Sequence, residues 1–161
     1  MRGEIDSLLP LLDRYGITLG IQNHSGDHDV CNAMGLRHLI ESYAPRHIAA
    51  VWDAGHNGLE GEAPESALDI VWSHLAMVNL KSAYWRRRAG KANEPAEWEA
   101  FWTTGKDGRA NWPRVVAELQ RRAYQGVVCL TAEYTEEADV DRLIAEDIAF
   151  ARALFAAHPA S

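Results

Sequence analysis

Four short polar clusters hold the residues of this sequence that could do chemistry, and each cluster directly follows an apolar run. They combine carboxylate, imidazole, amide and ammonium groups, which bind polar ligands; carboxylates and imidazoles also transfer protons. A small polar ligand is therefore the expected partner. The clusters are Gln22-Asn23-His24, Asp53-Ala54-Gly55-His56, Asn79-Leu80-Lys81-Ser82 and Thr131-Ala132-Glu133.

Two residues of these clusters have roles that their type and position suggest. His56 stands three positions after Asp53 on an expected turn, and its near-neutral pKa would suit proton transfer or a hydrogen bond to a hydroxyl group. The alternative is a loop histidine that caps backbone groups. Lys81 could neutralise a phosphate or a carboxylate of a ligand, or it could reach out into solvent.

The apolar runs before the clusters predict short buried strands at residues 17–21, 48–52, 75–78 and 127–130. Helical spacing of apolar residues predicts helices at about residues 4–15, 33–43, 64–73, 112–123 and 137–157. Gly16 stands where a glycine would end the first helix. Asn111, followed by Pro113, predicts the start of the helix at residue 112.

Alternating strands and helices require a parallel sheet with right-handed crossovers, either an open doubly wound sheet or a closed barrel. The polar clusters favour the barrel, because all four strands carry one at the carboxyl end, where a barrel gathers its active site. An open sheet would usually load only the loops beside a switch point. The expected fold class is therefore α/β, with about four βα units of a TIM-type barrel.

The composition of the 161-residue chain indicates globular material with one substantial core, since 47% of its residues are hydrophobic and 24% are charged. Its net charge of −7 argues against binding of nucleic acid, whose backbone needs a basic surface. The charged N-terminal segment is unlike a signal peptide, and no apolar run is long enough to span a membrane. Cys31 and Cys129 are expected to be buried free thiols, and the protein is expected to be cytoplasmic.

Four motifs, taken in order, resemble the xylose isomerase-like barrel family of sugar phosphate isomerases and epimerases. The first runs from Tyr15 to Leu19 and leads to Asn23-His24, and the next two are Trp52-Asp53-Ala54-Gly55-His56 and Val78-Asn79-Leu80-Lys81. The last runs from Gly105 to Trp112 and is followed by Tyr124-Gln125-Gly126. The resemblance implies that the chain holds the last four βα units of the barrel.

The resemblance further implies a first half of the barrel that these residues do not provide. A complete barrel of this type typically takes about 250 residues. Half a barrel exposes two unpaired strand edges and the apolar interior of the sheet, which normally must be covered. We expect residues 1–161 to form a single domain that corresponds to the C-terminal half of the barrel. It would be either a fragment that lacks its N-terminal half or one copy of a homodimer.

Members of the resembled family commonly bind Mg²⁺ or Mn²⁺ through Glu, Asp, His and Glu from the last four strands. At these positions this chain has Gln22, Asp53, Asn79 and Thr131, so only Asp53 keeps the family's residue. Glu133, two positions after Thr131, is expected on the same face of the strand. The expected metal ligands are therefore Asp53, Gln22 and Glu133, in an eroded site that could be lost altogether.

One long stretch, residues 83–111, is predicted to be an irregular loop with a function. It contains Arg86-Arg87-Arg88, which could lie near the substrate or simply be solvated. Trp85, Trp98 and Trp102 could present an apolar face to a sugar ring or cover the interface with the missing half.

The resemblance leads us to predict a sugar phosphate isomerase- or epimerase-like protein that acts on a small polyhydroxylated carbonyl compound by proton transfer. Alternatives are a non-catalytic sugar-binding or regulatory domain, a related dehydratase and a decayed copy. No nucleotide-binding motif occurs, so no nucleotide cofactor is expected. The expected catalytic residues are Asp53, Glu133 and His56, and the expected binding residues for a sugar or sugar phosphate are His24, Asn23, Asn79, Lys81 and Arg86.

Overall fold

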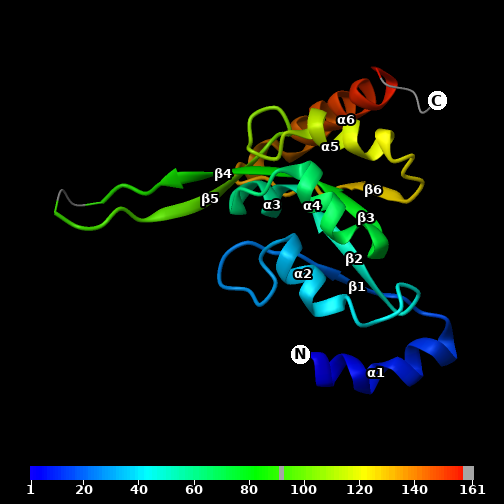
Figure 1. Ribbon diagram of the computed structural model, residues 1–161. Helices are drawn as coiled ribbons and strands as arrows, with labels where there is room; N and C mark the ends of the chain where they lie inside the picture. The colour runs from blue at the N-terminus through cyan, green and yellow to red at the C-terminus, as the bar shows by residue number, and fades with distance from the viewer. Residues whose placement is uncertain (91–92, 158–161) are drawn as a thin grey trace.

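The computed structural model describes residues 1–90 and 93–157, which form helices and strands in succession (Figure 1). The helices are α1 (Arg2–Tyr15), α2 (Ala33–Ile40), α3 (Ala54–Glu60), α4 (Pro64–Val71), α5 (Trp112–Arg121) and α6 (Val140–Ala157), with short 3₁₀ helices η1 (Trp72–His74) and η2 (Glu137–Asp139). The strands are β1 (Leu19–Gln22), β2 (Ile48–Asp53), β3 (Leu75–Leu80), β4 (Ser82–Arg87), β5 (Trp98–Thr103) and β6 (Val127–Leu130).

Four parallel strands form the main sheet, in the order β1-β2-β3-β6. They are the four predicted strands, with ends shifted by one or two residues in three of them. Neighbouring strands of the sheet follow one another along the chain with helices between them, as in the wall of an α/β barrel. The register pairs Asp53 of β2 with Asn79 of β3, and Asn79 with Cys129 of β6. The carboxyl ends of these three strands therefore lie side by side.

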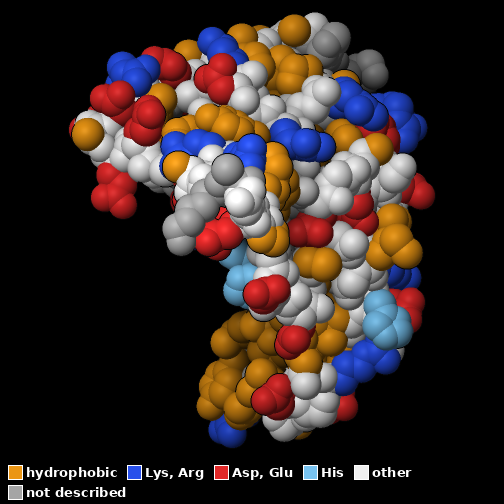
Figure 2. All heavy atoms as spheres, turned by 90° about the vertical axis from the view of Figure 1, so that its left-hand side faces the viewer, with side chains coloured by type: hydrophobic (Ala, Val, Ile, Leu, Met, Phe, Trp, Pro, Cys, Tyr) orange, Lys and Arg blue, Asp and Glu red, His pale blue; other side chains and the backbone are white. Residues whose placement is uncertain are grey.

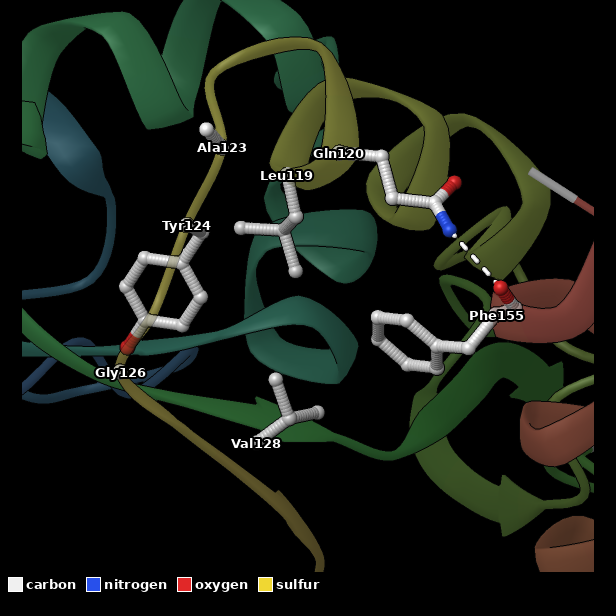
Figure 3. Close-up of a pocket in the computed structure, with 7 residues that line it drawn as sticks. All are labelled: Leu119, Gln120, Ala123, Tyr124, Gly126, Val128 and Phe155. Atoms are coloured by element: carbon white, nitrogen blue, oxygen red, sulfur yellow. Dashed lines mark hydrogen bonds between the residues drawn. The ribbon is translucent and has the colours of Figure 1, made fainter. Parts of the chain in front are cut away.

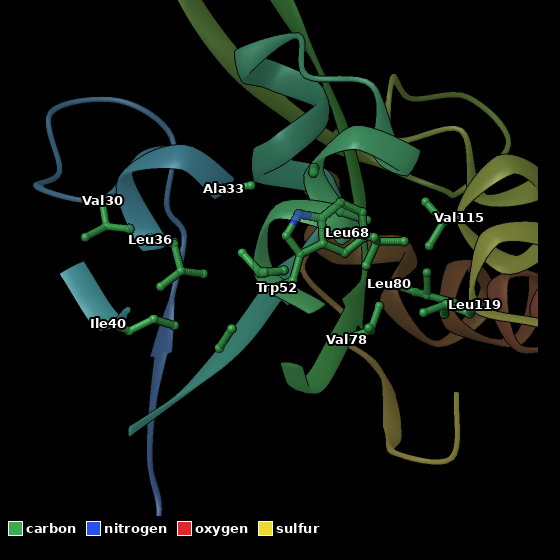
Figure 4. Close-up of a cluster of buried hydrophobic side chains, with 14 of the residues drawn as sticks. Val30, Ala33, Leu36, Ile40, Trp52, Leu68, Val78, Leu80, Val115 and Leu119 are labelled. Atoms are coloured by element: carbon green, nitrogen blue, oxygen red, sulfur yellow. The ribbon is translucent and has the colours of Figure 1, made fainter. Parts of the chain in front are cut away.

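The core lies between this sheet and the helices that cover one of its faces (Figure 4). Trp52 and Val78 extend from the middle strands toward Leu36 of α2, Leu68 of α4 and Val115 of α5. All five side chains are fully buried. Burial of such side chains stabilises the fold by roughly 1.5–3 kcal/mol each, so this contact layer holds the strands in register.

The opposite face of the sheet is more open. Along β1, Leu19 and Ile21 pack against the core, whereas Gly20 and Gln22 are exposed. Val127 at the start of β6 is 60% exposed, although Val128 packs against the core. The space-filling view has a concave outline, and histidine side chains reach the surface within its hollow (Figure 2). An uncovered inner face is what a partial barrel wall would present.

The prediction of an irregular loop at residues 83–111 is wrong. β4 and β5 pair there as an antiparallel hairpin that projects from the body of the molecule (Figure 1). Tyr84 opposes Phe101 across the two strands, and their ring centroids lie 5.1 Å apart. Aromatic cross-strand pairs of this kind stabilise the hairpin, and Trp85 of β4 also ties it to α3 by donating a hydrogen bond to the Leu59 carbonyl (3.1 Å).

The turn expected after Asp53 is also wrong, because α3 begins there. The Asp53 side chain caps this helix by accepting a hydrogen bond from the backbone N–H of His56 (3.0 Å). Glycines at positions 55 and 58 lower the intrinsic helix propensity, which explains why the periodicity of the sequence does not reveal α3. The capping aspartate and the close packing around the helix compensate.

Two helix boundaries confirm the sequence prediction. Gly16 ends α1 in the left-handed conformation, with φ of 62°. Asn111 caps α5, and Pro113 lies in its first turn. Cys31 and Cys129 are free, as expected, but they are only partly buried. Within the described residues, no helix combines the length and the apolar character needed to cross a membrane.

Candidate active site at the carboxyl ends of the strands

The structure brings several of the predicted site residues together at one edge of the sheet. Asp53 ends β2, and Lys81 directly follows β3. Glu133 lies three residues beyond β6, and its carboxylate reaches back to the Lys81 ammonium. Gln22 ends β1, and its amide reaches Asp53. The predicted clustering at the strand ends is therefore present in the fold.

Asp53 is completely buried, and both of its carboxylate oxygens accept hydrogen bonds. Its Oδ1 accepts the α3 capping bond, and its Oδ2 accepts a hydrogen bond from Gln22 Nε2 (2.9 Å). Burial raises the pKa of Asp53, against the lowering effects of the Lys81 charge and of hydrogen bonds from His56, Gly55 and Asn79. Because no part of the side chain is exposed, Asp53 is placed to position other groups rather than to touch a ligand.

Lys81 is the centre of charge in the cluster. Its Nζ lies 2.5 Å from Glu133 Oε2 and 3.8 Å from Asp53 Oδ2. It also lies 4.1 Å from the centre of a Trp102 ring, a cation–π distance. Only 5% of the lysine side chain is exposed, compared with 47% for Glu133. The ammonium is therefore enclosed by its protein neighbours, and Glu133 is the carboxylate that a ligand can reach.

His56 is fully buried beside this charge cluster. Its Nδ1 accepts a hydrogen bond from the Ser25 backbone N–H (3.1 Å), so the neutral ring carries its proton on Nε2. Burial, followed by the nearby positive charge of Lys81, lowers the pKa of His56 to about 3. The expected near-neutral pKa is absent, and the ring stays neutral at physiological pH.

The other residues predicted for β1 divide into a structural one and an exposed one. Asn23 is buried and exchanges two hydrogen bonds with the Asp53 backbone, at 2.8 and 3.1 Å, so it ties the end of β1 to the end of β2. His24 is exposed, and its ring centroid lies 3.8 Å from that of His56 and 4.0 Å from that of His28. His24 is thus available to a ligand, whereas Asn23 is not.

Three buried polar atoms in the clusters have no hydrogen-bond partner among the described residues: His56 Nε2, Asn79 Oδ1 and Thr131 Oγ1. Buried polar groups normally find partners, so each such atom needs an explanation. They come from the carboxyl ends of β2, β3 and β6 or from the residues just after them. Such a concentration of unsatisfied groups is typical of a site that binds a polar ligand or ordered water.

Arg86 lies elsewhere. It is on the hairpin strand β4, where its guanidinium donates two hydrogen bonds to Glu99 on β5, at 2.6 and 2.8 Å. Trp85 and Trp98 line an open pocket on the hairpin with Arg109. Of the three hairpin tryptophans, Trp102 is the one that contacts the charge cluster, through Lys81 and through the His56 ring at 4.8 Å.

A second pocket lies between α5, β6 and α6 (Figure 3). Its lining is largely apolar and includes Leu119, Val128 and Phe155, while Gln120 donates a hydrogen bond to the Phe155 carbonyl (3.0 Å). Among the described residues, its lining shares no member with the polar clusters and holds no carboxylate, imidazole or cation, and its one ionisable group, the Tyr124 hydroxyl, donates to the Val127 carbonyl (3.2 Å). This pocket is therefore a largely apolar gap between α5, β6 and α6, apart from the polar clusters.

The donor set does not fit the divalent metal that the sequence resemblance implies. Among residues 1–90 and 93–157, no group of three or more His, Cys, Asp or Glu side chains is placed to hold a metal ion. Asp53 and Glu133 are the carboxylates near the expected position, and both face the Lys81 ammonium. Gln22 and Asn79 bring no charge to offset the cost of dehydrating a dication.

Two contributors were not identified from the sequence. Ser25 presents both its backbone N–H and its hydroxyl to His56 Nδ1, at 3.1 and 2.9 Å. Gly55 lies so close to Lys81 that an added Cβ would meet the lysine Cγ at 2.7 Å. A glycine at the first turn of a helix beside a predicted site is a signal that could have indicated this close approach.

Comparisons with known proteins agree with this fold. The model of the xylose isomerase-like TIM barrel family matches residues 2–154. A search of curated protein sequences finds no significant match. Among solved structures, a 3-keto-D-glucoside 4-epimerase from E. coli aligns over 94% of this chain and 52% of its own, with 16% identity and a TM-score of 0.69.

Two further structures show the same fold. A xylose isomerase-like TIM barrel protein from Mycobacterium smegmatis, in complex with magnesium, aligns over 98% of this chain and 50% of its own, with 14% identity and a TM-score of 0.67. A D-psicose 3-epimerase, in the presence of D-fructose, aligns over 96% and 53%, with 17% identity and a TM-score of 0.58. This chain spans about half the length of each of these proteins. By fold and by family model, it belongs to the xylose isomerase-like TIM barrel family.

Proposed function

We propose that this chain carries the catalytic half of a sugar isomerase-like site, which moves a proton between adjacent carbons of a small polyhydroxylated carbonyl compound. The observation that carries the proposal is the pairing of a reachable carboxylate, Glu133, with a buried cation, Lys81, at 2.5 Å. The epimerase neighbours, which include a D-psicose 3-epimerase, support a carbonyl sugar as the substrate class.

The proposed chemistry assigns a separate role to each group. The Glu133 carboxylate takes the proton from the carbon next to the carbonyl, and the electron pair of that C–H bond forms a C=C bond. The carbonyl oxygen becomes an enolate oxygen, and Lys81 stabilises its negative charge by hydrogen bonding. Glu133 then returns the proton to the former carbonyl carbon, while the hydroxyl proton of the adjacent carbon passes to the former carbonyl oxygen, so that the C=C bond is replaced by a new C=O bond at that adjacent carbon. Asp53 holds the lysine in place and is therefore a positioning residue.

The number of reachable bases favours one reaction type. Asp53 is completely buried, so Glu133 is the accessible carboxylate of the cluster. A single base can remove and return a proton on the same side of the substrate, which converts an aldose to a ketose. Inversion at one carbon needs a second acid on the opposite side. On the groups that the described residues supply, we therefore propose isomerisation by a single base.

The test is exchange of substrate C–H protons for solvent deuterium, followed by NMR with D-fructose, D-psicose and D-tagatose as probes. The 161-residue chain is expected to exchange at least one of them. Glu133→Gln should reduce the rate by about 10²–10⁴-fold, the usual contribution of a general base. Glu136→Gln, an exposed carboxylate with no side-chain cap bond, is the matched control and should leave the rate unchanged. Saturable sugar binding without exchange would instead indicate a non-catalytic sugar-binding domain.

A further inference from the structure

We propose that the Lys81 ammonium is the resident cation of this site and occupies the place that a divalent metal would otherwise take. What the cation does in catalysis rests on the proposed function. Where the cation is, and what it excludes, can be measured without any reaction.

The position of Lys81 in the sheet carries the first step. β3 lies between β2 and β6 in the sheet, and Lys81 directly follows β3. The two carboxylates come from the flanking elements, Asp53 from β2 and Glu133 from the segment after β6. The ammonium lies 3.8 Å from one and 2.5 Å from the other. A positive charge is thus present at the point where the anionic side chains converge.

The residues around Lys81 leave room for its stem and cover its ammonium group. Gly55 leaves room for its stem, since a Cβ there would meet Lys81 Cγ at 2.7 Å and the Lys81 carbonyl oxygen at 3.1 Å. The Trp102 ring covers the ammonium at 4.1 Å, and a Cβ at Gly55 would also meet this ring at 3.1 Å. A lysine that is only 5% exposed and enclosed in this way is not a solvated surface side chain.

The remaining donors cannot hold a dication beside the lysine. Asp53 Oδ1 is used by the α3 cap, and Oδ2 accepts from Gln22. The His56 Nδ1 lone pair accepts from Ser25. A metal ion would have to displace an ammonium that is already paired, or remain in repulsive contact with it at low dielectric. The geometry therefore assigns a single cation to this position.

The experiment is a titration with Mn²⁺ followed by electron paramagnetic resonance, in which bound Mn²⁺ loses its free-ion signal. The wild-type chain is expected to bind no Mn²⁺ at millimolar concentrations. Lys81→Ala leaves the two carboxylates without a cation and should bind Mn²⁺ at least tenfold more tightly than wild type. Lys81→Met, which keeps the length of the stem, should also bind more tightly if the alanine variant fails to fold. Lys106→Met, at an exposed lysine, is the control and should behave as wild type.

Equal Mn²⁺ binding by wild type and by the folded Lys81 variants would overturn the inference, as would binding by none of them. Failure of the deuterium exchange experiment is a different result. If no sugar exchanges while the Lys81 variants gain Mn²⁺ binding, the proposed reaction is wrong and the assignment of the cation stands.

Discussion

Two charge clusters of this molecule have central charges of opposite sign, and comparing them distinguishes a candidate site from a structural ion network. In one, the Lys81 ammonium faces two carboxylates at the ends of the strands. In the other, the Glu118 carboxylate on α5 faces two guanidinium groups, those of Arg121 and Arg122, at 2.7 and 2.6 Å. Each cluster has one buried central charge, but their surroundings differ.

In the Glu118 cluster, the charged groups form hydrogen bonds with one another. Arg121 and Arg122 donate three hydrogen bonds to Glu118, and Arg122 continues to Asp69 at 2.6 Å. These contacts fasten α5 to α4. In the Lys81 cluster, by contrast, buried polar atoms of His56, Asn79 and Thr131 have no hydrogen-bond partner in the part of the chain that the structure describes. Satisfied groups stabilise a fold, whereas a concentration of unsatisfied buried groups next to a reachable carboxylate indicates a functional site.

The largest predicted effect is that of Lys81→Met on the rate at which substrate C–H protons exchange for solvent deuterium. Loss of the group that stabilises the enolate charge should reduce the rate by about 10²–10³-fold. The methionine keeps the stem beside Gly55 but leaves the buried Asp53 carboxylate without its cation, so the melting temperature should also fall. Rates from NMR exchange and melting curves from circular dichroism give the two values. A variant with an unchanged exchange rate would show that Lys81 is a structural charge like Glu118.

Gly55→Ala should disturb the same cluster from the backbone side. Its Cβ would lie 2.7 Å from Lys81 Cγ, so the lysine and Trp102 must shift. Overpacking of this kind typically costs about 1–3 kcal/mol of unfolding free energy. Urea denaturation measures the loss. Gly3→Ala, where nothing lies within 4 Å, is the control and should be neutral or slightly stabilising. Equal effects of both changes would mean that the close approach is not required.

Glu118→Gln should lower the free energy of unfolding without changing the rate of deuterium exchange into the substrate. Removal of the carboxylate from two guanidinium groups should cost about 1.5–3 kcal/mol, as expected for hydrogen bonds to charged groups. The pKa of Glu118 is lowered from 4.5 to about 2, chiefly by the hydrogen bond from Arg121.

The sign of the pH dependence follows from that lowered pKa. The contribution of Glu118 is complete above the unfolded pKa of about 4.5 and is lost as the pH falls toward about 2. Between these values the wild type should therefore lose stability more steeply than Glu118→Gln. Chemical denaturation at several pH values measures both curves, and parallel curves would contradict the assignment.

The smallest predicted effect is that of Arg86→Ala. The guanidinium pairs with Glu99 across the hairpin and is largely exposed, so its loss should cost less than about 1 kcal/mol. Exchange should be unchanged, because the structure shows no contact between Arg86 and the described residues of the Lys81 cluster. A tenfold or greater fall in the exchange rate would instead support the sequence-based expectation that Arg86 binds the substrate.

The sequence predicted the parallel strands and their polar ends well, because short β-branched runs and the polar residues after them are local signals. It did not reveal the hairpin, although Tyr84, Trp85, Phe101 and Trp102 have high β propensity. Charged residues and glycines around these aromatics resembled a loop. Their pairing depends on contact between segments 11 or more residues apart, which local patterns do not encode.

The arrangement within the candidate site was harder to predict than its location. The sequence placed Asp53, Lys81 and Glu133 at neighbouring strand ends, but it gave no measure of their burial. Burial separates the reachable Glu133 from the enclosed Asp53, and it lowers the pKa of His56 to about 3. Depth in a fold results from packing of distant helices and strands, so residue types and spacing alone could not supply it.

The most direct test of the account is the thermal melt of the wild-type chain in millimolar MnCl₂ and in EDTA. A ligand that binds the folded state raises its stability, and for a chain of this size each 1 kcal/mol shifts the melting temperature by about 2–4 °C. With Lys81 as the resident cation, the two melting temperatures should agree. A rise of several degrees with Mn²⁺ that disappears in Asp53→Asn would contradict the account and restore a metal site.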